Sequence, residues 1–118
     1  MAESTRALQD LPPTPVEVSS FIEKGQLIFR TDDANAIYVY DKDQPGRSVC
    51  EEGCVSTWWP VLARTSDAKP LGAWTLVARK DGTKQWAYKG RPIYTFIHDT
   101  PGQAKGDGVG GVWHVIKP

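Results

Sequence analysis

The sequence lacks two features that would quickly assign it to a functional class: a net charge and a long apolar run. Its 118 residues hold 14 basic and 14 acidic side chains, so the formal net charge is zero. A balanced charge argues against a general nucleic-acid binder or a basic protein of membrane surfaces. No apolar run approaches the roughly 20 residues that a membrane-spanning helix needs. What remains is a globular chain long enough for one domain with a modest core.

Cysteine, histidine and methionine are also scarce. The chain has two cysteines, Cys50 and Cys54, and two histidines, His98 and His114. Two cysteines do not complete a metal site, and their spacing is not that of a thioredoxin-type pair or of a haem-attachment motif. Met1 is the sole methionine, which disfavours a His/Met copper or haem site. Four residues on a helical turn rise about 6 Å, a separation that a disulfide bridges. A Cys50–Cys54 disulfide is therefore feasible, and it points to an oxidising compartment.

What the sequence does contain is a duplication. Residues 37–46 read Ile-Tyr-Val-Tyr-Asp-Lys-Asp-Gln-Pro-Gly, and residues 93–102 read Ile-Tyr-Thr-Phe-Ile-His-Asp-Thr-Pro-Gly. About twenty residues after the start of each copy a second match follows, at 59–61 (Trp-Pro-Val) and at 113–115 (Trp-His-Val). Two matches in the same order predict a duplicated structural unit. The equivalent positions are Tyr38, Tyr40 and Asp43 in the first copy and Tyr94, Phe96 and Asp99 in the second.

Short strand-like segments separated by turn residues predict an all-β domain. The expected strands are residues 16–18, 26–30, 36–41, 74–79, 85–89, 93–97 and 112–116. Residues 50–58 form the only expected helix, and the Asp-Gly pair at 81–82 marks a hairpin turn. We therefore predict a pseudo-symmetric antiparallel barrel or sandwich. It is a single domain of residues 16–118, made of repeats at about 24–62 and 74–117. Residues 1–15, polar and then proline-rich, are expected as a disordered or extended linker without the apolar core of a signal peptide.

The repeated Tyr-x-aromatic-x-x-Asp element occurs at residues 38–43 and 94–99, and further characteristic strings accompany it. Residues 81–90 read Asp-Gly-Thr-Lys-Gln-Trp-Ala-Tyr-Lys-Gly, and residues 106–115 read Gly-Asp-Gly-Val-Gly-Gly-Val-Trp-His-Val. In this order they resemble the bacterial "secreted repeat of unknown function" family, over about residues 24–117. The resemblance implies an exported protein, periplasmic or extracellular, with lipid anchoring of the full-length precursor as a further expectation. It implies no particular ligand or reaction.

The candidate metal ligands are His98, His114 and Asp107. His98 lies in a repeat strand and His114 lies in the last strand, so the imidazoles converge if those strands are neighbours. Two histidines leave a site incomplete, and Asp107 or Asp99 would have to complete it for copper, zinc or haem. The alternative is that both histidines are surface or hydrogen-bonded residues and no cofactor is bound.

Asp43 and Asp99, which occupy equivalent positions in the two repeats, are expected to accept hydrogen bonds from turn amides.

The segment 102–111 holds five glycines, which permit positive φ angles, and one aspartate. We predict an ordered loop in which Asp107 accepts backbone N–H hydrogen bonds and positions Trp113 at the start of the final strand. In the alternative, Asp107 and His114 belong to an ion site.

Three function hypotheses follow. The first is an exported cell-envelope binding or structural module with an unidentified ligand or partner. The second is a metal- or haem-binding protein that supports envelope redox chemistry through His98 and His114. The third is a binder of carbohydrate or surface polymer through an exposed tryptophan. No serine-nucleophile motif, phosphate loop or suitable carboxylate pair is present, so we do not expect an enzyme. We expect a monomer or a weakly associating chain, without a nucleic-acid partner.

Overall fold

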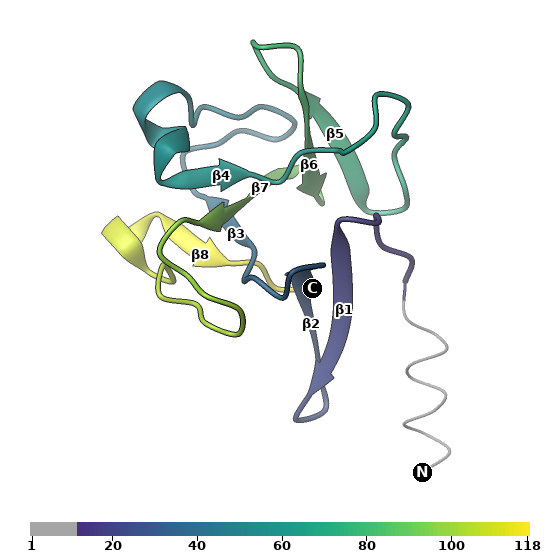
Figure 1. Ribbon diagram of the computed structural model, residues 1–118, viewed down its shortest axis with the longest axis vertical. Helices are drawn as coiled ribbons and strands as arrows, with labels where there is room; N and C mark the ends of the chain where they lie inside the picture. The colour runs from purple at the N-terminus through teal and green to yellow at the C-terminus, as the bar shows by residue number, and fades with distance from the viewer. Residues whose placement is uncertain (1–11) are drawn as a thin grey trace.

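The computed structural model describes residues 12–118, and it is built from antiparallel strands (Figure 1). Most of the expected linker therefore lies outside the described residues. The strands are β1 (Val18–Glu23), β2 (Gln26–Thr31), β3 (Tyr38–Tyr40), β4 (Trp58–Pro60), β5 (Trp74–Ala78), β6 (Lys84–Tyr88), β7 (Arg91–Phe96) and β8 (Trp113–Val115). The two 3-10 helices of this part of the chain are η1 (Glu52–Ser56) and η2 (Val109–Gly111). Between residues 12 and 118, no helix is long and apolar enough to cross a membrane.

The main sheet has the order β5-β6-β7-β3-β8, and β4 also pairs with β7. Strands β1 and β2 form a separate hairpin, which projects from the main body in Figure 1. All the pairings are antiparallel, so the expected all-β antiparallel fold is confirmed. The sheet order has two ends rather than closing on itself, which excludes the barrel and leaves the sandwich-like arrangement.

Several elements differ from the sequence expectation, and two of them, β4 and η2, have no counterpart among the expected strands and helix. The strand expected at 16–18 begins instead at Val18 and runs to Glu23, because Lys24 and Gly25 have φ angles of 51° and 79° and turn the chain back into β2. Paired positive φ angles are typical of tight hairpin turns. The helix expected at 50–58 is a 3-10 helix of residues 52–56. Trp58 already belongs to β4, where pairing with β7 outweighs local helix formation.

Side-chain alternation in the central strands builds a core on each face of the sheet. Ile37, Val39 and Ile93 pack with Trp74 and Trp86 in one cluster. The second cluster contains four buried aromatic side chains, Tyr38, Tyr94, Trp58 and Trp113, together with Ala36 and Cys50. The polar hydroxyls and indoles of the duplicated motif therefore lie inside the protein.

The two repeats pair directly with each other. Strands β3 and β7 run antiparallel with Tyr38 opposite Tyr94, so an approximate two-fold axis passes between the two tyrosines. Strand β4 adds to β7 with Trp58 opposite Phe96.

The mirrored arrangement holds for β8, which adds to β3 with Trp113 opposite Tyr40. Trp58 is therefore the counterpart of Trp113, and the sequence match of Trp59 to Trp113 is wrong by one residue. Trp59 corresponds instead to His114.

Candidate functional site

The spacing of tyrosine and aspartate, which is the same in both repeats, has a structural use: it allows hydrogen bonds that join one repeat to the other. The Tyr38 hydroxyl donates to Asp99 Oδ2 at 2.6 Å, and the Tyr94 hydroxyl donates to Asp43 Oδ2 at 2.7 Å. Both tyrosine side chains have no solvent exposure. Hydrogen bonds to ionised acceptors are among the stronger ones in proteins. The two pairs therefore join the repeats reciprocally at the buried axis.

The second oxygen of each aspartate holds the loop that follows it. Asp43 Oδ1 accepts from the backbone N–H of Val49, and Asp99 Oδ1 accepts from that of Lys105, both at 2.7 Å. The pKa of the Asp43 carboxyl lies above its ordinary value, because burial raises it by more than the hydrogen bonds from Tyr94 and Val49 lower it. Both oxygens of each carboxylate are therefore engaged in hydrogen bonds within the fold.

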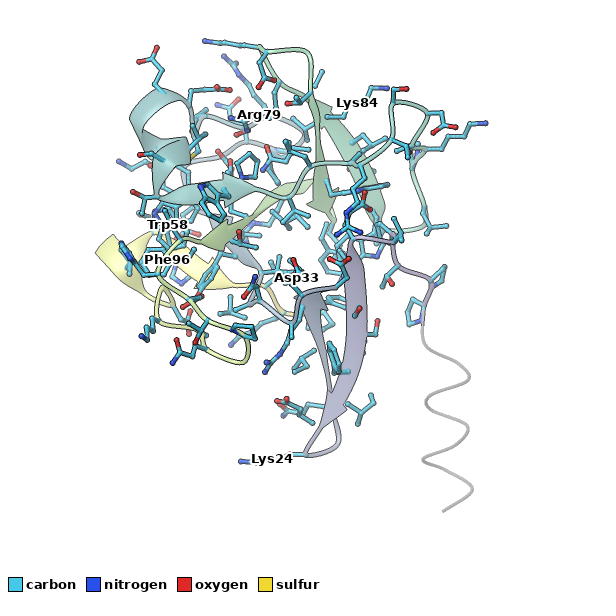
Figure 2. The ribbon with its side chains drawn as sticks, viewed as in Figure 1. Lys24, Asp33, Trp58, Arg79, Lys84 and Phe96 are labelled. Atoms are coloured by element: carbon cyan, nitrogen blue, oxygen red, sulfur yellow. A yellow bond between two sulfur atoms is a disulfide. The ribbon has the colours of Figure 1, made fainter. Side chains whose placement is uncertain are left out.

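Four aromatic rings form a continuous stack across the same axis. The order is Tyr40, Trp113, Trp58 and Phe96, with centroid separations of 4.2, 3.8 and 4.4 Å. The two indoles at its centre are within 3° of parallel. Figure 2 labels Trp58 and Phe96, which lie together where β4 meets β7. Such stacks contribute about 0.5–1.5 kcal/mol per pair beyond the burial of their area.

A buried guanidinium joins the disulfide loop to the second repeat. Arg79 donates to Gln85 Oε1 at 2.7 Å, to Ser48 Oγ at 3.0 Å and to the Cys50 carbonyl at 2.8 Å. Ser48 also lies 2.6 Å from the Tyr94 hydroxyl. The Cys50–Cys54 disulfide is present, as expected. With its donors satisfied, this network serves as scaffold for the loop of residues 47–57.

The structure does not bring the expected metal ligands together. His114 Nε2 lies 2.8 Å from Asp41 Oδ2. His98 lies in the turn after β7 rather than in the strand, and its ring is nearly perpendicular to that of Phe96, with the ring centroids 5.1 Å apart. Asp107 Oδ1 accepts a backbone N–H from β8 at 3.1 Å, rather than one within its own loop. Strand β3 separates β7 from β8, which keeps the two histidines apart. Within residues 12–118, no group of three or more His, Cys, Asp or Glu side chains is placed to hold a metal ion.

One tryptophan stands apart from the others. Trp59 is 52% exposed, whereas the remaining four tryptophans are at most 5% exposed. It lies on a groove of about 230 Å³ between β4 and the turn after β2. The other lining residues are Glu17, Thr31, Asp32, Asp33, Asn35, Pro60, Val61, Leu62, Arg64 and Thr95. The sequence could not single out Trp59 because the neighbouring Trp58 fits the same pattern.

Polar groups surround the indole in this groove. The buried Glu17 carboxylate accepts from Trp86 Nε1 at 3.0 Å and from the Arg64 backbone N–H at 2.7 Å. The Arg64 guanidinium forms an ion pair with Asp32, which raises the pKa of Arg64. Asn35 Oδ1 is buried and, in the part of the chain described, has no hydrogen-bond donor. The groove thus offers an aromatic face beside carboxylate, amide and guanidinium groups.

The second repeat has a groove in the equivalent place, with the opposite charge. Its lining includes His114, Val115, Ile116 and Val39, and it encloses about 430 Å³. By the strand register, these four residues correspond to positions 59, 60, 61 and 95 of the first groove. The other lining residues are Tyr88, Lys89, Arg91 and Lys117. The two grooves therefore share a backbone framework and differ in their side chains.

Comparison with known proteins agrees with the sequence resemblance. Residues 75–117 match the model of a family described as "Secreted repeat of unknown function". No curated protein and no solved structure matches the chain. The matched segment contains the second repeat strand, the glycine-rich loop and β8.

Proposed function

We propose, from the match of residues 75–117 to the secreted-repeat family, that this protein is an exported, non-catalytic binding module whose ligand occupies the groove at Trp59. The ligand class is a saccharide of the cell envelope or its surroundings. The observation that carries the proposal is the exposure of Trp59 in a chain that buries its other four tryptophans.

The position of Trp59 suits ligand binding. In β4 the neighbouring Trp58 points into the aromatic core, so alternation turns Trp59 outward on a strand that is anchored to β7. A fixed, exposed indole stacks on the apolar face of a sugar ring without first having to be ordered. The volume of about 230 Å³ is below the usual range for drug-sized ligands, which suits one ring of a longer chain.

The reactive side chains elsewhere support a binding role rather than catalysis. Ser48 lies within the Arg79 and Tyr94 network, and His114 is paired with Asp41. Nucleophilic catalysis needs a hydroxyl beside a base in an accessible cleft. Metal- or haem-based redox chemistry through His98 and His114 is the less favoured candidate, because the two side chains have separate partners.

The experiment is a binding screen of the purified chain against a panel of oligosaccharides, followed by titration of the best ligand. Trp59→Ala should weaken its binding by about tenfold or more, which corresponds to about 1.4 kcal/mol. Phe21→Ala is the matched control, because Phe21 is also an exposed aromatic and does not line the groove. The proposal is wrong if Trp59→Ala binds as well as the unmodified protein, or if no oligosaccharide binds.

A further inference from the structure

The charge of the Trp59 groove restricts the sugar that it can take. Its ionisable lining groups are the carboxylates of Glu17, Asp32 and Asp33 and the guanidinium of Arg64, which leaves two net negative charges. We propose that the groove recognises a saccharide carrying a protonated amine, an amino sugar with a free ammonium group. This inference rests on the proposed function and names the ligand class of the same site.

The three carboxylates of the groove differ in the hydrogen bonds and ion pairs that they already form. Glu17 already accepts two hydrogen bonds, and Asp32 is paired with Arg64. Among residues 12–118, Asp33 enters no ion pair or side-chain hydrogen bond. It is exposed on the turn after β2, where Figure 2 labels it. Asp33 is therefore the carboxylate left for a ligand cation.

Trp59 and Asp33 are complementary parts of a cation site. An ammonium group is attracted to the face of an indole, and the attraction grows as water is removed. A carboxylate beside the ring supplies the counter-charge and accepts the ammonium N–H groups. A neutral sugar gains the stacking but leaves the groove charge uncompensated, and an anionic sugar is repelled.

Asn35 adds a hydrogen-bond acceptor to the same groove. Its Oδ1 has no donor, and a buried acceptor without a partner costs about 1–3 kcal/mol. Asn35 lines the groove, so its side-chain amide is the nearest unpaired acceptor for a ligand N–H or O–H there. A donor-rich ligand such as an amino sugar meets this need.

The equivalent groove of the second repeat shows that the fold itself does not require acids at this place. There His114 replaces the indole and pairs with Asp41, while Lys89, Arg91 and Lys117 make the rim basic. The same framework thus carries opposite charges in its two copies. The acidic lining around Trp59 is a property of that groove and fits a cationic ligand.

The test is calorimetric titration of the full chain with three β-1,4-linked oligosaccharides of equal length. One is built of glucosamine, one of N-acetylglucosamine and one of glucose. Mildly acid pH keeps the sugar amine protonated and the aspartates ionised. The glucosamine oligomer should bind at least about tenfold more tightly than the other two, and added salt should reduce this preference.

Two variants and one control separate the possible results. Asp33→Asn should remove most of the preference for the amine but keep the stacking, whereas Trp59→Ala should weaken binding of all three sugars. Asp67→Asn removes an exposed carboxylate that does not line the groove, and it should change neither the preference for the amine nor the affinity for the three sugars. Trp59-dependent binding without a preference for the amine, or with a preference for an added galacturonate oligomer, overturns this inference and leaves the binding function standing. Absence of binding by any saccharide overturns both.

Discussion

The stability of this domain should fall steeply above about pH 10, because two buried phenols must stay protonated in the folded state. Tyr38 and Tyr94 are fully buried, and each donates its proton to an aspartate of the other repeat. Burial, and then the hydrogen bond to that carboxylate, raises the pKa of both hydroxyls well above the ordinary tyrosine value. In the unfolded chain both titrate near pH 10.

The size of the effect follows from proton linkage. Between the unfolded and folded pKa values the native state holds two protons that the unfolded state has lost. The contribution of each tyrosine is complete below about pH 10 and decreases by about 1.4 kcal/mol per pH unit above it. The two together give a slope of about −2.7 kcal/mol per pH unit. A domain with a typical stability of about 5–15 kcal/mol would lose a large part of it within two units.

Urea unfolding followed by tryptophan fluorescence, repeated at steps from about pH 8 to 12, measures this slope across the tyrosine range. Tyr38→Phe and Tyr94→Phe should each halve the slope of the unfolding free energy against pH in this range. Each should also lower stability at neutral pH by about 1–3 kcal/mol, because an aspartate loses its tyrosine donor. Tyr88→Phe is the control, since this residue belongs to neither pair. An unchanged slope in both pair variants would refute the argument.

Two further predictions concern the loops on either side of the axis. Replacing both Cys50 and Cys54 with serine should lower the unfolding free energy by about 2 kcal/mol, the chain-entropy value for so short a loop. Thiol titration of the unfolded protein without reductant should find no free thiol, and finding two would contradict the disulfide. Gly106→Ala should cost about 1–3 kcal/mol in chemical denaturation, since its Cβ would lie 2.6 Å from the Trp58 ring. Gly53→Ala is its control, because a Cβ there meets nothing within 4 Å. Equal stability of the two glycine variants would argue against the close packing at Trp58.

The fold class could be predicted from the sequence because short strand-like segments alternate with turn residues, and the duplicated motif indicates the internal symmetry. The Tyr-x-aromatic-x-x-Asp strings correspond to β3 and β7 and the turns after them. The exact equivalence of the tryptophans could not be predicted, because Trp58 and Trp59 both satisfy the pattern and only pairing with Phe96 decides between them. The β1–β2 hairpin was only partly predicted, since serines at 19 and 20 interrupt its apolar pattern.

Much less of the candidate site could be predicted. The sequence shows His98 and His114 but not the strand β3 that lies between their strands. Long-range pairing decides that placement, and no local pattern encodes it. The groove at Trp59 combines β4 with the turn after β2 and with Glu17, segments far apart along the chain. Only the three-dimensional arrangement shows which of five tryptophans remains exposed.

Ligand binding at Trp59 is tested most directly by a nitrogen–proton correlation spectrum of the ¹⁵N-labelled protein, recorded during titration with the glucosamine oligomer. Each of the five tryptophans contributes one indole N–H signal. We expect the signal assigned to Trp59, by its loss in Trp59→Ala, to shift progressively to saturation. The buried indoles of Trp58, Trp74 and Trp113 should shift little. A titration that leaves the Trp59 signal in place, or moves the buried indoles instead, would contradict it.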